Sequence, residues 1–75
     1  MKTVDIKLSS IEDVRNFVNI VTKYDIDIDL ASGRYIVDAK SIMGIFSLDL
    51  MNPIQLTAHS EDTDKLFEDI KPYII

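Results

Sequence analysis

The sequence predicts an α+β protein, an open-faced β-sandwich in which three helices cover one face of a four-stranded antiparallel sheet, in the order β-α-β-β-α-β-α. Three observations lead to this prediction. Apolar and polar residues alternate in several segments, which is typical of strands with one buried face. Other segments carry apolar residues at helical spacing. No linker, repeat or low-complexity tract interrupts the chain, which favours a single domain over residues 1–75.

The chain begins with a predicted strand that leads into a helix. Val4, Ile6 and Leu8 alternate with polar residues, as in a half-buried strand. The period then becomes helical, with a stripe made of Ile11, Val14, Phe17, Val18 and Val21. Two serines at 9–10, followed three residues later by acidic residues at 12–13, are a helix-start signal. We therefore expect the first helix over about residues 10–23.

The middle of the chain predicts a hairpin. Alternation returns over Ile26–Leu30, and Tyr35–Lys40 is expected to pair back as the third strand. Ser32-Gly33 lies between them and is suited to a tight turn, because glycine accepts the positive φ that such turns require.

The last part predicts two helices on either side of a fourth strand. Ser41 is expected to cap a short helix over about residues 42–50, which ends at Asn52-Pro53 because the residue before proline avoids the α region. Alternation over 54–59 predicts the fourth strand. Ser60 is expected to cap the last helix, which Pro72 stops and whose inward residues are Leu66, Phe67 and Ile70.

The composition excludes several classes of function. Without cysteine, neither a disulfide framework nor a thiolate metal site is possible. The net charge of −5 argues against nucleic acid and anionic membranes as partners. No apolar stretch approaches the length of a membrane span, so we expect a cytoplasmic protein. No catalytic triad, glycine-rich phosphate loop or metal-ligand cluster is found, which predicts no cofactor, no metal and no enzymatic activity.

The runs Lys40-Ser41-Ile42-Met43-Gly44 and Lys23-Tyr24-Asp25 resemble the bacterial phosphocarrier protein HPr of the phosphotransferase system. Ser41-Ile42-Met43-Gly44, preceded by Lys40 and followed by Ser47-Leu48, is similar to the regulatory-serine signature of that family. Lys23-Tyr24-Asp25 and the alternating residues after it are also family-like. The order of predicted elements is the same, and the resemblance covers nearly the whole chain.

The resemblance breaks where family members carry Gly-Ile-His-Ala-Arg-Pro, whose histidine accepts a phosphoryl group. Counting back from Lys23-Tyr24-Asp25 places Ser10 at the histidine, Glu12 at the arginine and Asp13 at the proline. An unactivated serine is a poor acceptor. Each carboxylate, at about 6 Å from a bound phosphate, would repel it by roughly 3 kcal/mol per unit of phosphate charge before salt screening. That repulsion exceeds the roughly 0.3–1 kcal/mol from the helix dipole, so we expect no histidine-type relay.

The only histidine, His59, is not expected to replace the missing one. It stands at the end of the fourth strand. In the family topology that end lies about 15–20 Å from the start of the first helix, at roughly 3.3 Å per residue. We interpret His59 as an exposed strand-end residue.

Two features could carry function. Ser41 is explained by capping alone, but the resemblance implies phosphorylation by a dedicated kinase and docking of the product onto a regulator. The short helix has too many apolar residues for one buried face: Ile45 and Leu48 are expected to point inward, and the resemblance places Ile42, Met43 and Phe46 outward as a docking patch. Scattered exposed apolar residues are the alternative reading of that patch.

Three aspartates, Asp25, Asp27 and Asp29, alternate along the second predicted strand. We interpret them as the solvated face of that strand, because no nearby Glu or Gly completes a calcium loop.

The leading hypothesis is therefore a non-catalytic, HPr-like regulatory or adaptor protein. By resemblance, its partners are proteins such as HPr kinase or a regulator, and phosphorylation of Ser41 controls their docking. The alternative is a divergent domain with the same fold, no phosphorylation and an unrelated partner. Phosphorylation of the purified protein by HPr kinase would distinguish the two.

Overall fold

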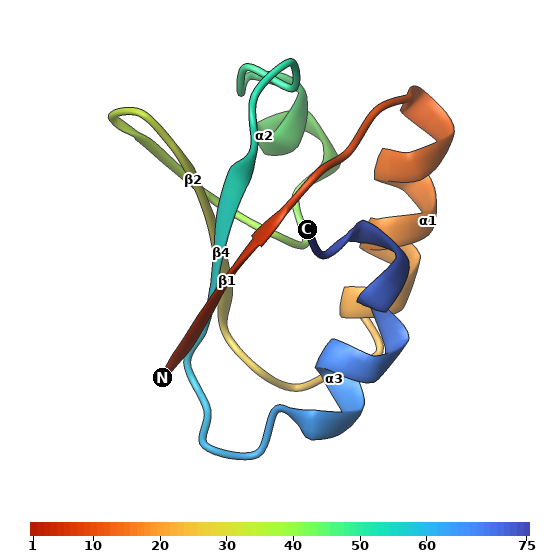
Figure 1. Ribbon diagram of the computed structural model, residues 1–75, viewed down its shortest axis with the longest axis vertical. Helices are drawn as coiled ribbons and strands as arrows, with labels where there is room; N and C mark the ends of the chain where they lie inside the picture. Colours follow the sequence, from red (N-terminus) through yellow and green to blue (C-terminus); the bar gives the residue numbers. More distant parts are fainter.

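The computed structural model describes every residue from Met1 to Ile75, and it has the predicted order of elements (Figure 1). The strands are β1 (Lys2–Ile6), β2 (Ile28–Ser32), β3 (Tyr35–Asp38) and β4 (Ile54–Ala58). The helices are α1 (Ile11–Val21), α2 (Ile42–Phe46) and α3 (Asp64–Asp69), followed by the 3-10 helix η1 (Lys71–Tyr73). None of these helices has the length and apolar character needed to cross a membrane.

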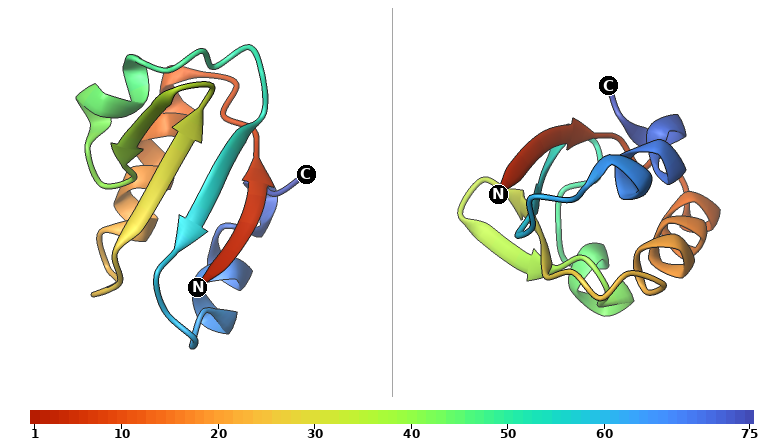
Figure 2. Two further views of the ribbon diagram at one scale, coloured as in Figure 1. Left: turned by 90° about the vertical axis from the view of Figure 1, so that its left-hand side faces the viewer. Right: turned by 90° about the horizontal axis from the view of Figure 1, so that it is seen from below.

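The strands form one antiparallel sheet with the order β1-β4-β2-β3. Ile6 pairs with Ile54 at one end of β4, and Lys2 pairs with Ala58 at the other. On its opposite side β4 pairs with β2, so the last strand to be synthesised becomes a central one. Figure 2 shows the helices together behind the sheet, whose other face is open. The predicted open-faced sandwich is thus confirmed.

A two-residue turn joins β2 and β3 at the predicted place. Ser32 pairs with Tyr35, so Gly33 and Arg34 form the turn. Gly33 has a φ of 59°, and no residue other than glycine has a positive φ in this chain. Glycine at the first turn position followed by a residue with negative φ is the type II′ pattern, whose twist matches that of the flanking strands.

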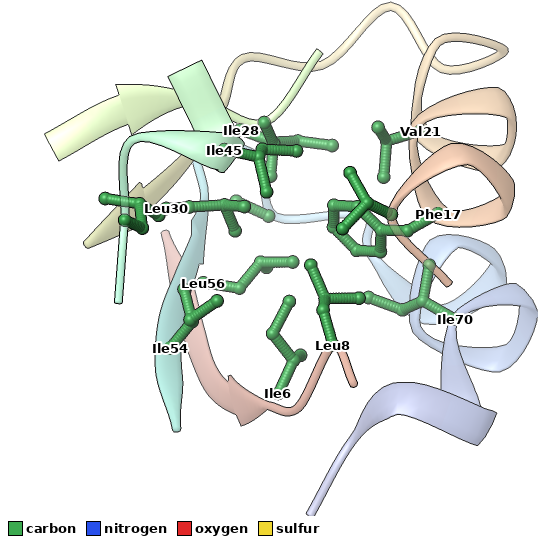
Figure 3. Close-up of a cluster of buried hydrophobic side chains, with 14 of the residues drawn as sticks. Ile6, Leu8, Phe17, Val21, Ile28, Leu30, Ile45, Ile54, Leu56 and Ile70 are labelled. Atoms are coloured by element: carbon green, nitrogen blue, oxygen red, sulfur yellow. The ribbon is translucent and has the colours of Figure 1, made fainter. Parts of the chain in front are cut away.

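The alternating apolar residues of the strands meet the inner faces of the helices in one core (Figure 3). Phe17 lies at the centre of the inner face of α1, and its ring meets the Tyr73 ring edge-on, with centroids 5.9 Å apart. Truncating a buried Phe typically lowers stability by about 3–5 kcal/mol. The core residues are Ile6, Leu8, Val14, Phe17, Val21, Ile28, Leu30, Ala39, Ile45, Leu48, Ile54, Leu56, Ala58, Leu66 and Ile70.

The first strand and the second strand both differ from their predicted limits. β1 starts at Lys2 and leaves the sheet after Ile6, because the Lys7 N–H donates to the Tyr73 carbonyl at 2.8 Å. Leu8, although outside the strand, is fully buried. β2 starts only at Ile28, so the residues at 26–27 precede it.

α2 is shorter than the predicted 42–50 because the hydrogen bonds change after Phe46. The Ser47 and Leu48 N–H groups donate to carbonyls three residues earlier, at 3.1 and 3.0 Å. The Asp49 carboxylate then accepts hydrogen bonds from the Met51 N–H and the Asn52 side chain. These local bonds replace the α-helical pattern and turn the chain toward β4.

The last helix begins later than predicted, and Ser60 does not cap it. Thr63 precedes the first helical residue, and its buried hydroxyl has no hydrogen-bond partner. Ser60 Oγ instead accepts a hydrogen bond from the Asp62 N–H at 3.1 Å, which closes a local turn. Leu66 and Ile70 are buried as predicted.

Candidate functional site

α1 begins at a serine cap that closes its first turn. Ser10 has an extended backbone, and its Oγ accepts a hydrogen bond from the Asp13 N–H at 3.0 Å. The Asp13 carboxylate in turn accepts a hydrogen bond from the Ser9 N–H at 3.0 Å. This reciprocal arrangement is similar to a capping box and confirms the predicted start signal. The Ser10 oxygen is therefore engaged with the backbone of its own helix.

Negative charge surrounds this helix start. Glu12 is exposed and Asp13 is half-buried, both in the first turn of α1. Neither carboxylate belongs to an ion pair. Burial raises the pKa of the Tyr73 hydroxyl, and the Asp13 charge raises that pKa further. A phosphoryl dianion placed here would experience the same unfavourable field.

The only histidine lies at the other end of the sheet. His59 follows β4, and its ring Nε2 is 2.7 Å from Asp29 Oδ2. The chain enters α1 from β1, whose last residue, Ile6, pairs with Ile54 at the opposite end of β4. The strand register thus separates His59 from Ser10 by the length of β4, roughly 16 Å at about 3.3 Å per residue.

α2 begins at a second serine cap. Ser41 is exposed, and its Oγ accepts a hydrogen bond from the Gly44 N–H at 3.1 Å. A Cβ on Gly44 would lie 3.1 Å from Ser41 Oγ and 3.2 Å from Val37 Cβ. Glycine therefore allows the short helix to approach both its cap and β3. The first turn of α2 has no acidic residue. The predicted capping role of Ser41 is confirmed, and its phosphorylation stays a prediction.

The two family-like runs of sequence hold each other in place. Lys40 Nζ donates a hydrogen bond to the Tyr24 carbonyl at 2.7 Å, and the Lys40 N–H donates to Asp38 at 2.9 Å. The Tyr24 hydroxyl donates to the Asp69 carboxylate on α3. This hydrogen bond, followed by desolvation and the Asp69 charge, raises the pKa of Tyr24 to about 12. The segment before α2 is thus tied to the end of α1 and to α3.

Exposed apolar side chains on α2 form only part of the predicted docking patch. Met43 is 76% exposed and Phe46 is 41% exposed, while Ile45 and Leu48 are buried as predicted. Ile42 is half-buried and packs against the core, so the prediction that it projects outward is wrong. Residues three apart share a helix face, and Ile42 therefore follows Ile45 toward the core. We call Met43 and Phe46 the α2 patch.

Other apolar residues are also exposed, and two of them, Ile11 and Met51, were not expected to be. Ile11, expected on the buried stripe, is 64% exposed, although Val14 one turn later is fully buried. Met51, in the loop after α2, is 84% exposed. Figure 1 shows the start of α1 and α2 at the same end of the molecule. Periodicity could not identify these residues, since it reports the face of a helix and not where the helix leaves the core.

The acidic segment at β2 borders an open pocket of about 440 Å³. Asp25 and Asp27 are exposed, and Asp29 is half-buried beside His59. Asp38 and Lys40 also line this pocket. No group of three or more His, Asp or Glu side chains is arranged to hold a metal ion.

Residues 13–74 match the family model described as the PTS HPr component phosphorylation site. The match includes the Lys23-Tyr24-Asp25 run and the Ser41 signature, and it begins three residues after Ser10. No curated protein sequence matches the chain.

Solved structures similar to this chain include HPr proteins and Crh. HPr-C-His from Thermoanaerobacter tengcongensis is 28% identical with a TM-score of 0.81, over 96% of this chain and 89% of that one. HPr from Bacillus anthracis is 27% identical with a TM-score of 0.73, over 99% and 94%. Crh, a Bacillus subtilis catabolite repression protein described as a swapped dimer, is 25% identical with a TM-score of 0.66, over 93% and 87%. Since the family model spans residues 13–74, this chain belongs to the HPr family.

Proposed function

We propose that this protein is a non-catalytic regulatory or adaptor member of the HPr family, which docks to protein partners through the α2 patch and carries no phosphohistidine. The observation that carries the proposal is the start of α1, where a serine cap and two carboxylates lie at the place that the resemblance assigns to the phosphoryl-accepting histidine. An exposed apolar surface on α2 lies at the same end of the molecule.

The chemistry at the start of α1 opposes phosphoryl transfer in two ways. A neutral imidazole accepts a phosphoryl group readily near pH 7, whereas a serine needs a general base, and Ser10 has none beside it but Asp13. Asp13 accepts a backbone hydrogen bond and carries the charge that would repel the donor phosphate. The two roles conflict, so Ser10 acts as a cap.

The α2 patch has the chemistry of a docking surface. Met43 and Phe46 expose large apolar side chains one helical turn apart. Burying each against a partner would contribute roughly 1.5–3 kcal/mol, and the flexible thioether of Met43 can adapt to the partner's shape. Ile42, half-buried beneath them, supports the patch from the core side.

Ser41 is the proposed control point for this docking. Its hydroxyl is exposed and lies two residues from Met43, with no carboxylate in the first turn of α2. Phosphorylation there would add about two negative charges next to the patch and release Oγ from its bond to the Gly44 N–H. By family resemblance the kinase is HPr kinase, and the docking partner is a regulator. The similarity to Crh, a catabolite repression protein, supports a regulatory role.

Two incubations test the proposal. In the first, enzyme I and phosphoenolpyruvate should give no acid-labile phosphate on this protein, and such a phosphate on His59 would overturn the claim. In the second, HPr kinase and ATP should phosphorylate Ser41, as located by mass spectrometry. The Ser41→Ala variant is the matched control. Phosphate at Ser10 or Ser47, or none, would favour the alternative of an HPr-fold domain with an unrelated partner and no phosphorylation.

A further inference from the structure

β3 forms an open edge of the sheet. The strand order leaves β1 and β3 as the two edges. The C-terminal segment covers part of β1, since the Ile75 N–H donates to the Asp5 carbonyl and Ile6 bridges to Ile74. β3 has no such cover: its backbone pairs with β2 and with the turn that follows, and with nothing else. Figure 2 shows β3 at the margin of the sheet, next to β2.

The unpaired backbone groups of β3 belong to alternate residues. The Ala39 N–H donates to the Ile28 carbonyl at 2.9 Å, so residues 39, 37 and 35 direct their backbone groups toward β2. Residues 36 and 38 therefore direct theirs outward. The Ile36 N–H and carbonyl have no partner within the chain. The Ile36 and Tyr35 side chains are 70% and 68% exposed, an unusual feature for apolar residues on an edge strand.

The sequence along this edge is complementary to itself. In an antiparallel pair centred on Ile36, the Ile36 residues of two copies lie opposite each other. Arg34 of one copy then lies opposite Asp38 of the other, at both ends of the pair. Ile36 is the residue that offers both outward backbone groups, because Arg34 belongs to the turn and the Asp38 carbonyl accepts the Ser41 N–H at 3.0 Å. Arg34 and Asp38 would therefore meet through their side chains. Neither Arg34 nor Asp38 has an ion-pair partner within its own chain.

Asp38 has a second reason to accept a cation from outside. Within the sheet it lies directly opposite Asp29, and like charges at opposed positions destabilise a strand pair. Asp29 is paired with His59, whereas the Asp38 carboxylate accepts only the Lys40 N–H. An arginine brought to Asp38 would offset the repulsion without changing the fold of either copy.

We propose that the β3 edge is a self-association surface, at which two copies pair antiparallel around Ile36 with reciprocal Arg34–Asp38 contacts and join their sheets into one. The interface has a twofold axis through the Ile36 pair, as closed dimers generally have. It leaves β1 in its own sheet, unlike an exchange of strands between copies. The proposal does not rest on the α2 patch or on phosphorylation of Ser41.

Sedimentation velocity from micromolar to millimolar concentration, at low salt, tests the proposal. It compares the unaltered protein with variants in which the charges at residues 34 and 38 are reversed singly or exchanged together. The unaltered protein should show a rapid, reversible monomer–dimer equilibrium, with the Ile36 N–H protected from hydrogen exchange as the dimer forms. Arg34→Asp and Asp38→Arg should each weaken the dimer by roughly tenfold or more, because each places like charges opposite each other. The double variant restores opposite charges and should recover most of the affinity.

Asp5→Arg is the matched control, since it makes the same charge change on the outer face of the other edge strand. It should leave the dimer unchanged, and amide NMR spectra should show that every variant is folded. A protein that stays monomeric at millimolar concentration would overturn the proposal. A dimer that resists both single variants would also overturn it, as would one that exchanges over hours in the manner of swapped strands.

Discussion

The starts of α1 and α2 share a capping device and differ in charge. Ser10 Oγ and Ser41 Oγ each accept a hydrogen bond from the N–H three residues later, at 3.0 and 3.1 Å. The first turn of α1 contains Glu12 and Asp13, whereas the first turn of α2 contains no acidic residue. Both serines therefore provide an acceptor for an N–H at the start of their helix. Only the first turn of α2 lacks the carboxylates that would repel a phosphate.

The two helices also differ in how much they depend on the rest of the molecule. α1 has 11 residues and buries Val14, Phe17 and Val21. α2 has 5 residues and buries only Ile45 within its span. A helix that short is not stable by itself and is held by its cap and its packing against β3. Ser41, the proposed control point, thus lies on the less independent element, where we expect a change in the cap to affect the α2 patch.

The largest expected effect concerns the charges at α1. Ser10→His alone should accept no measurable phosphate from enzyme I, because both carboxylates remain. Adding Glu12→Arg and Asp13→Pro should raise phosphorylation by about a hundredfold or more, given roughly 3 kcal/mol per carboxylate before screening. Acid-labile phosphate measured by ³¹P NMR decides the result.

A neutral control separates charge from shape at the same positions. Ser10→His with Glu12→Gln and Asp13→Asn should accept more phosphate than Ser10→His alone and less than the variant with Arg and Pro. The amides remove the repulsion without supplying a cation. Equal phosphorylation of all three variants would show that charge is not what disables this helix start.

The next effect concerns the α2 patch. Changing Met43 and Phe46 together to Ser should weaken binding to a partner isolated by pull-down by about a hundredfold or more, as expected for two buried apolar anchors. Met51→Ser is the matched control, since Met51 is more exposed than either but lies outside α2. Isothermal titration calorimetry measures the affinities.

The acidic residues at β2 provide the opposite test. Changing Asp25, Asp27 and Asp29 to Asn should alter the association rate and its salt dependence while keeping most of the affinity. If this triple variant lost binding and the Met43/Phe46 variant kept it, docking would have to be reassigned to the acidic surface.

A smaller effect is expected when either cap is removed. Ser10→Ala and Ser41→Ala should each lower the free energy of unfolding by about 0.5–2 kcal/mol, because each leaves a helix N–H without its acceptor. Ser→Thr at the same positions keeps the hydroxyl and should recover most of the loss. Urea unfolding monitored by circular dichroism gives these values, and no loss at Ser41 would mean that its cap is dispensable.

The smallest effect concerns the hydrogen bond between Tyr24 and Asp69, which ties the segment after α1 to α3. Since the Asp69 hydrogen bond raises the pKa of Tyr24 to about 12, the folded state favours the protonated phenol. This contribution to stability is fully present below about pH 10, the usual tyrosine pKa, and is lost as pH rises through about 12. In an absorbance titration, Asp69→Asn should move the Tyr24 midpoint back toward 10, and an unchanged midpoint would contradict the assignment.

Local sequence signals predicted more of the fold than of the site. The alternation at Ile54, Leu56 and Ala58 predicted a strand with one buried face, and all three are buried. The start signal at residues 9–10 and the predicted cap at Ser41 are both confirmed, since Ser10 Oγ and Ser41 Oγ each accept a hydrogen bond from the N–H three residues later. The prediction failed at Ser60, where a turn to Asp62 competes with capping over the same few residues.

By itself, the sequence determined the order of elements, the turn at Gly33, the two serine caps and the charge at the start of α1, because each depends on residues within one or two turns of chain. Only the tertiary structure decided that Ile42 turns inward while Ile11 and Met51 stay exposed. It also decided that Tyr24 meets Asp69 and that β3 is left as an open edge. These outcomes depend on where distant segments come to lie, and a periodic pattern records the face of an element but not what that face will meet.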